Sequence, residues 1–221
     1  MEADAVGIGY GHPVCPPVSF RLGAAEVLAV VGANGSGKST LLRTAVGLLA
    51  PLAGRLAVLG ADPDGRSARF RAAVASDLGD DAFFPALTVR EHLLITCYGH
   101  GVPEPVDVVT DLVEGFGLEE VVHALPSALS SGQRRRVLLA SAFARPRSLM
   151  ILDEPEQRLD SGMRRALALR LVAERERGGA VLLATHDPIL VRDAATTAVV
   201  LTATRAEVVT AERAATTMDS L

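Results

Sequence analysis

A glycine-rich stretch that ends in a lysine and a serine carries the clearest chemistry in the sequence. Residues 32–39 read Gly-Ala-Asn-Gly-Ser-Gly-Lys-Ser, between an apolar run and a helical pattern. Glycines let successive backbone N–H groups point at phosphate oxygens, and a helix N-terminus adds partial positive charge. A simple glycine-rich turn would not require the flanking elements, so the stretch is interpreted as a nucleoside triphosphate loop. The expected nucleotide contacts are Asn34, Gly35, Ser36, Gly37, Lys38, Ser39 and Thr40.

The lysine and the serine of this loop have separate expected tasks. Lys38 is the single lysine among 22 basic residues, and the others are arginines. A compact ammonium on a flexible stem suits a phosphate ligand. We therefore expect Lys38 to contact the β- and γ-phosphates and the Ser39 hydroxyl to bind Mg²⁺.

Two carboxylates end a second apolar run. Residues 149–152 are Leu-Met-Ile-Leu, and Asp153 and Glu154 follow directly. In an open parallel sheet, ligands bind at the carboxyl ends of the strands. We expect Asp153 to hold Mg²⁺ through water and Glu154 to orient or deprotonate the attacking water. A buried strand with a merely polar end is the alternative interpretation.

The elements that position these residues alternate between strands and helices. Short apolar runs bounded by glycine, proline or polar residues predict strands, and longer periodic stretches predict helices. This alternation predicts an α/β fold whose mostly parallel sheet is covered on both faces. The predicted strands are residues 6–10, 19–22, 27–31, 54–59, 149–152, 180–184, 199–201 and 207–210, and the predicted helices are residues 39–49, 132–144, 161–177 and 188–194.

A helical segment interrupts this alternation. Residues 88–129 read as mostly helical with a break at 99–105, and Thr88 followed by Glu91 forms a capping-box pattern. We expect a single domain over residues 1–221, with a helical subdomain inserted at about residues 88–144. Residues 60–71 are expected to form a loop and a helix start, and residues 211–221 are expected to fray.

Composition excludes several classes of protein. Hydrophobic residues make up 49% of the chain, but its apolar runs are far shorter than the roughly 20 residues of a membrane-spanning helix. The N-terminus shows no secretory pattern, which favours the cytoplasm. Cys15 and Cys97 are far apart and are expected to be reduced thiols. The net charge of −4 argues against a nucleic-acid partner.

A third motif lies between the phosphate loop and the carboxylate pair. Residues 129–133 read Leu-Ser-Ser-Gly-Gln, which closely resembles the Leu-Ser-Gly-Gly-Gln signature of the ATP-binding cassette (ABC) ATPase family. The motifs also follow the family's order, from an aromatic residue at Tyr10 to a histidine at His186. The resemblance implies a P-loop NTPase with a mostly parallel core sheet, an N-terminal antiparallel β subdomain and an inserted helical signature subdomain.

The resemblance assigns roles to residues outside the phosphate loop. Tyr10 would stack on the adenine of ATP, with an ordinary strand tyrosine as the alternative. His186 would touch the γ-phosphate, and it would act in catalysis together with Glu154 and Lys38.

Other positions imply a second subunit. In the family, the signature contacts the γ-phosphate of ATP held by the partner subunit, and the D-loop crosses the interface between them. The active site would therefore be completed only by dimerisation. The residues that match these two motifs are Ser130, Gly132, Gln133 and Asp160.

The sequence departs from the family at several positions. Ser131 replaces the first glycine of the signature, and no glutamine stands in the Q-loop segment at residues 76–81. An aspartate from that segment could contact Mg²⁺ or water instead. Glu156 and Arg158 replace smaller D-loop residues. Residues 134–136 are three arginines, interpreted as a solvated helical turn rather than a nucleic-acid patch.

The leading functional hypothesis is the ATP-hydrolysing subunit of an ABC transporter. The expected partners are a separate polytopic membrane permease and a second ABC subunit, either identical or paralogous. The permease would hold the chain at the inner face of the cell membrane, docked on the helical insert and residues 77–87, and the short C-terminus favours export. The alternatives are a soluble single-cassette ATPase with a non-membrane partner and a cassette with impaired turnover. A phosphate-loop kinase or GTPase would lack the signature.

Overall fold

The computed structural model describes residues 1–79 and 82–218, and a six-stranded sheet forms its centre. The strand order is β5-β6-β7-β3-β8-β9, and every neighbouring pair is parallel except β8 and β9. This confirms the predicted mostly parallel core. The strands are β3 (Val27–Val31), β5 (Val74–Asp77), β6 (Leu149–Asp153), β7 (Ala180–Ala184), β8 (Thr197–Leu201) and β9 (Ala206–Thr210).

A second, antiparallel sheet comes from the N-terminal part of the chain. Its order is β2-β1-β4, with bounds Glu2–Gly7 for β1, Val18–Arg21 for β2 and Ala53–Ala57 for β4. The predicted first strand, at residues 6–10, was placed too late. Ala3 pairs with Phe20 and Val6 with Val18, so the ladder begins near the N-terminus and ends before Tyr10.

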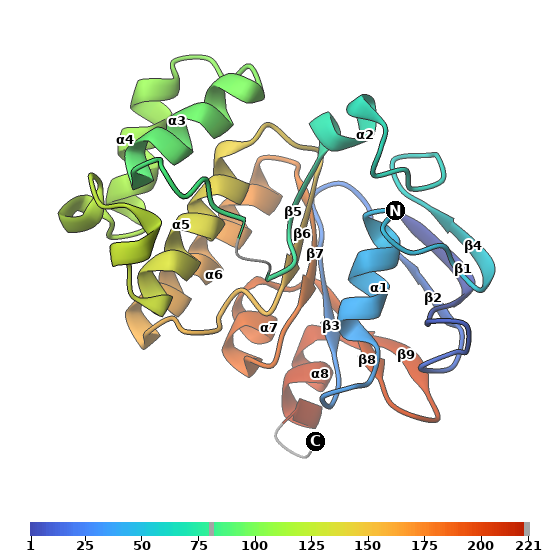
Figure 1. Ribbon diagram of the computed structural model, residues 1–221. Helices are drawn as coiled ribbons and strands as arrows, with labels where there is room; N and C mark the ends of the chain where they lie inside the picture. Colours follow the sequence, from blue (N-terminus) through green and yellow to red (C-terminus); the bar gives the residue numbers. More distant parts are fainter. Residues whose placement is uncertain (80–81, 219–221) are drawn as a thin grey trace.

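Helices cover both faces of the large sheet (Figure 1). Alternate side chains of a strand point to opposite faces, and the buried clusters follow this rule. Leu28, Val30 and Ile151 pack with α1 and the small sheet, whereas Met150 and Leu183 pack with α5 and α6. The helices are α1 (Lys38–Ala45), α2 (Ala68–Ala73), α3 (Val89–Gly99), α4 (Pro105–Gly115), α5 (Ser131–Ala144), α6 (Ser161–Glu176), α7 (Pro188–Ala194) and α8 (Ala211–Met218), with 3₁₀ turns at Glu119–Val121 and Pro126–Ala128.

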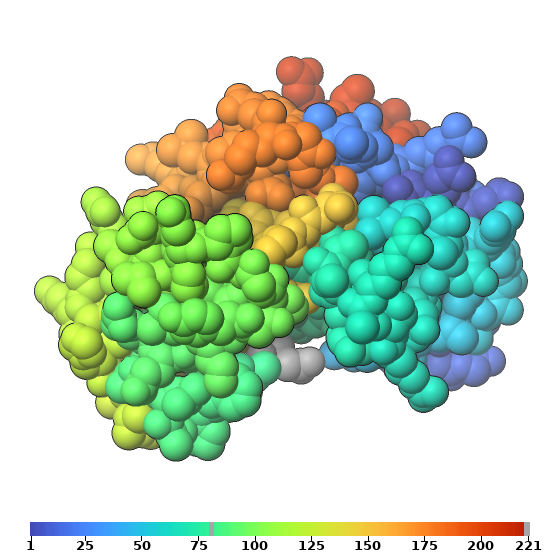
Figure 2. Space-filling model, turned by 90° about the horizontal axis from the view of Figure 1, so that it is seen from above, coloured from blue at the N-terminus to red at the C-terminus, as the bar shows by residue number. Residues whose placement is uncertain are grey.

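The helical insert lies between β5 and β6 in the chain and contains α3, α4 and α5. The predicted capping box begins α3: the Glu91 N–H donates to Thr88 Oγ1 at 3.3 Å, and the Thr88 N–H donates to Glu91 Oε2 at 2.8 Å. The predicted break is also present, since α3 ends at Gly99 and α4 begins at Pro105. Figure 2 shows α3 and α4 of the insert, in green, as a lobe beside the segment that contains α2.

Other segments also differ from the predictions. Helix α1 ends at Ala45 rather than residue 49, because Gly47 adopts φ 77° and turns the chain. Strand β5 and its pairing with β6 were not predicted. Residues 211–218 do not fray but form α8, which buries Ala211, Ala214 and Ala215 against the large sheet. Residues 219–221 lie outside the described part.

Across residues 1–79 and 82–218, no helix is both long enough and apolar enough to cross a membrane.

Candidate active site

The phosphate loop connects β3, an interior strand of the large sheet, to the first residue of α1. Two of its glycines have no room for a side chain. A Cβ on Gly32 would lie 2.3 Å from the Leu201 carbonyl oxygen, and one on Gly37 would lie 2.9 Å from a methyl group of Val14. Gly37 also has φ 103°, which residues with a Cβ rarely adopt. The packing around the loop therefore demands glycine at both positions.

Lys38 begins α1 and is only 4% exposed. Its ammonium donates hydrogen bonds to the carbonyl oxygens of Gly32 at 3.0 Å and Ala33 at 3.1 Å. Burial lowers the pKa of Lys38, and the nearby carboxylates of Glu154 and Asp153 act in the opposite direction. The buried ammonium thus lies beside the loop in the field of the carboxylates from β6. This position is suitable for a phosphate ligand.

Asp153 and Ser39 form the candidate Mg²⁺ site. Asp153 ends β6, and its Oδ1 atom is buried without a hydrogen-bond partner among the described residues. Burial raises the pKa of Asp153, and a hydrogen bond from the Ser39 hydroxyl opposes this shift. Mg²⁺ in nucleotide sites is held by one or two carboxylates together with substrate phosphates. An unpartnered carboxylate oxygen beside a hydroxyl fits that ion.

Glu154 and His186 meet although they follow different strands. The Glu154 Oε1 atom lies 3.2 Å from His186 Nε2, and Glu154 Oε2 also accepts a hydrogen bond from the Gln157 side chain. Glu154 adopts φ 45°, a left-handed conformation that costs about 1–2 kcal/mol for a residue with a Cβ. The structure thus holds this carboxylate on a strained turn, a feature typical of functional sites.

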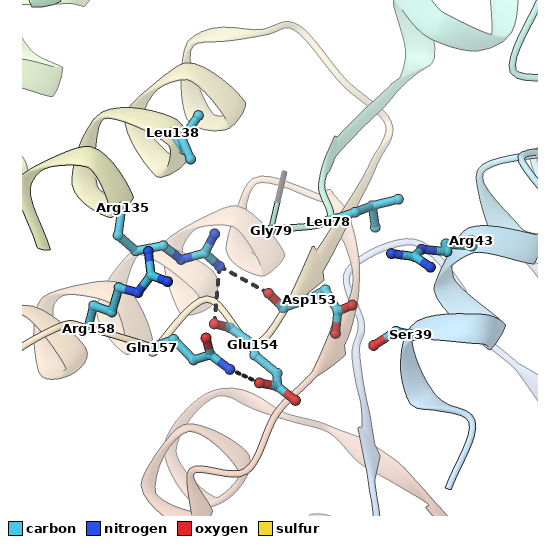
Figure 3. Close-up of a pocket in the computed structure, with 10 residues that line it drawn as sticks. All are labelled: Ser39, Arg43, Leu78, Gly79, Arg135, Leu138, Asp153, Glu154, Gln157 and Arg158. Carbon is cyan, nitrogen blue, oxygen red and sulfur yellow. Dashed lines mark hydrogen bonds between the residues drawn. The ribbon is translucent and has the colours of Figure 1, made fainter. Parts of the chain in front are cut away.

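Two pockets contain Glu154 and His186, two of the predicted catalytic residues. One, of about 280 Å³, is lined by Ser39, Asp153 and Glu154, and Figure 3 shows their side chains around it. The other, of about 210 Å³, is lined by Asn34 and His186. The contact between Glu154 and His186 connects the residues of the first pocket with those of the second. The fold therefore brings together the loop, the carboxylate pair and the histidine.

Glu156 supports the histidine segment, a role that sequence reasoning did not find. Its side chain is only 7% exposed, and Oε1 accepts hydrogen bonds from the Thr185 hydroxyl at 2.7 Å and the His186 N–H at 2.8 Å. Burial is the main cause that raises the pKa of Glu156. The sequence contained one indication of this role, because Glu156 is a carboxylate at a D-loop position where the family has a smaller residue.

The interpretation of the arginines after the signature as a solvated turn was wrong for Arg135. Arg135 is 6% exposed, and its Nη1 atom lies 2.8 Å from Asp77 Oδ2, forming a buried ion pair. Arg136 donates to the carbonyl oxygens of Phe116 and Gly117. Asp77, one candidate replacement for the Q-loop glutamine, therefore pairs with an arginine. The other candidates, Asp80 and Asp81, lie outside the described residues.

The signature residues form the N-terminus of α5. Ser130 caps α5, with reciprocal hydrogen bonds to Gln133 of 3.2 Å and 2.8 Å. A Cβ on Gly132 would lie 2.9 Å from the Arg158 carbonyl oxygen, whereas Ser131 is exposed. Among the described residues, positions 130–133 line neither pocket that contains phosphate-loop residues. A single chain therefore does not bring its own signature to its own phosphate loop.

Three predicted contacts remain, namely Tyr10, Asp160 and Thr40. Tyr10 is exposed beyond β1, and its hydroxyl accepts a hydrogen bond of 3.1 Å from Arg43 of α1. Asp160 caps α6 by accepting a 2.8 Å hydrogen bond from the Met163 N–H. The half-buried Thr40 lies in the first turn of α1.

Known proteins that resemble the chain show its family. The sequence profile of the ABC transporter family matches residues 15–157. The chain belongs to this family. It is an ATP-binding cassette with the fold and the ATPase activity of the family, as predicted from the signature. ATP is its nucleotide, and Mg²⁺ is typical of such cassettes.

Two curated relatives and two solved structures illustrate the similarity. The chain is 35% identical to a cytochrome c biogenesis ATP-binding export protein, CcmA, of Cupriavidus necator, over 82% of each chain. It is 35% identical to the Nod factor export ATP-binding protein I of Rhizobium etli, over 84% of this chain and 60% of the relative. An ATP-binding subunit of an ABC transporter superposes with a TM-score of 0.84 at 27% identity, over 95% of this chain and 89% of that one. A dimeric bacterial ABC transporter cassette gives 0.81 at 21% identity, over 95% and 98%, which supports the fold alone.

Proposed function

We propose that this cassette drives an export system by hydrolysing ATP at sites shared between two ABC subunits, with a separate polytopic permease in the membrane. The catalytic part of this proposal rests on one observation. Glu154 contacts His186, and both residues line pockets that also contain phosphate-loop residues. The relatives named as ATP-binding export proteins support the export part. The permease would hold the chain at the inner face of the cell membrane.

The proposed chemistry assigns one task to each group. The loop N–H groups and Lys38 bind the phosphates, and Tyr10 stacks on the adenine. Ser39 and Asp153 hold Mg²⁺, which supplies positive charge to the phosphate oxygens when bound. Glu154 accepts a proton from the attacking water or orients it, and His186 contacts the γ-phosphate beside it. Glu154 Oε1 and His186 Nε2 lie 3.2 Å apart, so the two side chains share a direct polar contact.

The exposed signature supports a shared active site. Residues 130–133 lie at the N-terminus of α5, whose partial positive charge suits a phosphate. Their own phosphate loop lies elsewhere, so we propose that they close over the ATP of a second subunit, identical or paralogous. Asp160 would lie at the same interface.

A groove between the helical insert and the core is the proposed permease site. It has a volume of about 460 Å³ and lies among α3, α5 and β5. Phe84 and Leu48 line it with large exposed side chains, while His92 is buried with Nδ1 unpartnered among the described residues. Figure 2 shows a hollow between the insert and the lobe around α2. A helix of the permease would bury apolar side chains here, as in other helix-in-groove complexes.

The first experiment tests the catalytic assignment. Glu154→Gln removes the base but keeps the size of the side chain, so it should abolish hydrolysis and trap an ATP-bound dimer. Size-exclusion chromatography with ATP and Mg²⁺ measures the dimer, and phosphate release measures turnover. A variant that stays monomeric, or that hydrolyses ATP at the parent rate, would contradict the assignment.

The second experiment tests the groove. Phe84→Asp and Leu48→Asp place a charge on the groove wall, and they should release the chain from native membranes while leaving basal hydrolysis unchanged. Leu169→Asp is the matched control, because Leu169 is a 70% exposed leucine on α6 outside the groove. Retention of both groove variants by membranes, or equal release of the control, would contradict the proposed site. A parent chain that never co-purifies with a polytopic protein would favour a soluble ATPase.

A further inference from the structure

Arg135 reaches from the signature helix into the turn that carries Glu154. Its guanidinium makes four polar contacts, all with residues far away in the sequence. Nη2 donates to the carbonyl oxygens of Asp153 at 3.0 Å and Glu154 at 3.1 Å, and Nε donates to that of Pro155 at 3.3 Å. Figure 3 shows this side chain extending from α5 to the end of β6. One planar group therefore binds three consecutive carbonyls.

These three carbonyls flank the strained residue of the site. Glu154 has φ 45°, and such a conformation persists only where the surroundings fix it. The hydrogen bonds to the carbonyl oxygens of Asp153 and Glu154 fix the peptide planes on both sides of the Glu154 Cα. The direction of the Glu154 carboxylate, towards His186 Nε2 at 3.2 Å, thus depends on Arg135.

Asp77 holds the other edge of the guanidinium. Both partners of this ion pair are buried, with side-chain exposures of 6%. Asp77 Oδ1 also accepts a 3.1 Å hydrogen bond from the N–H of Gly79, which lines the catalytic pocket. Asp77 lines the groove between the insert and the core, while Arg135 lines the catalytic pocket. The ion pair consequently connects the two cavities directly.

We propose that Arg135 is a positioning residue for ATP hydrolysis, which holds Glu154 in its catalytic conformation and is itself oriented by Asp77. In this chain an ion pair therefore connects the end of β5 to the catalytic turn. It lies in the segment where the family has its Q-loop glutamine. The inference rests on the proposed role of Glu154 and is independent of the permease.

Removing one partner alone is a poor test, because it leaves a buried charge unpaired and destabilises the fold. The informative variant is the double substitution Asp77→Asn with Arg135→Gln, which replaces the ion pair by two neutral amides of similar size. It leaves no buried charge unpaired, so it should melt closer to the parent than Arg135→Gln alone. Its KM for ATP should stay the same, because the phosphate loop is untouched. Its kcat should fall about 100-fold, the scale of a misplaced catalytic group.

Two further variants complete the design. Arg135→Lys keeps a charge for Asp77 but cannot form the planar set of bonds to three carbonyls, so it should fold while kcat falls by a similar factor. Arg136→Gln is the matched control from the same helix, since Arg136 binds carbonyls of the insert only, and it should keep the parent kcat.

The outcomes separate positioning from structure. The proposal is supported by a low kcat with unchanged KM in a folded double variant, or in Arg135→Lys if the double variant does not fold. Recovery of both stability and kcat in the neutral pair would show that Arg135 only balances Asp77 and would overturn it. An equal loss in Arg136→Gln would overturn it as well. Failure of the proposed function is a different result, namely full hydrolysis by Glu154→Gln.

Discussion

The buried carboxylate of Glu156 gives the sharpest prediction about stability. Glu156→Ala removes the acceptor of the Thr185 hydroxyl and of the His186 N–H. A buried donor left without a partner costs about 1–3 kcal/mol, so the two together should cost about 2–4 kcal/mol, since the His186 N–H is only partly buried. For a chain of this size, each kcal/mol lowers the melting temperature by about 2–4 °C. A decrease of about 4–16 °C is therefore expected.

The matched variant is Glu156→Gln, which keeps a carbonyl oxygen for both donors. Burial raises the pKa of Glu156 in the folded chain, so the neutral form is favoured there. A carboxyl with a raised pKa contributes stability that is present below its ordinary pKa and is lost as pH rises through the raised pKa. The glutamine variant should therefore match the parent at low pH and equal or exceed it at neutral pH.

Thermal unfolding followed at several pH values, together with phosphate release at saturating ATP, measures both effects. Because Glu156 holds the backbone of His186, the alanine variant should also lose about tenfold or more in kcat, whereas the glutamine variant should keep it. An alanine variant that melts with the parent would refute the reasoning. So would a glutamine variant that is destabilised as much as the alanine variant.

Three further predictions follow from individual contacts. Tyr10→Ala should raise the KM for ATP about tenfold through lost stacking, and Tyr10→Phe, which loses only the hydrogen bond from Arg43, should not; equal effects of the two would exclude stacking. Arg147→Ala breaks a partly buried, two-point contact with Glu174, which keeps Arg177 nearby, and should destabilise the fold by about 1.5–3 kcal/mol in urea unfolding, while the KM for ATP stays unchanged. Gly37→Ala should abolish ATP binding in calorimetry, because its Cβ would meet Val14; normal affinity would contradict the packing argument.

The core of the fold was predictable where a local pattern carried the information. Fully apolar runs identified β3, β6 and β7, and the glycine and capping patterns placed the phosphate loop and the start of α3. Strand β5 was not predicted, because its four residues include a serine and an aspartate and have no clear period. Its identity as a strand depends on pairing with β6, which no local pattern reports.

The sequence by itself determined the chemistry of the site: a phosphate loop, two carboxylates, a signature and a histidine in the order of an ABC cassette. Only the tertiary structure decided which side chains support them. Arg135 meets Asp77 across 58 residues, and Glu156 meets His186 across 30. Such partners depend on the register of β5, β6 and β7 at one end of the sheet. Register follows from the packing of the whole core, so a three-arginine run looks solvated until the fold buries its middle residue.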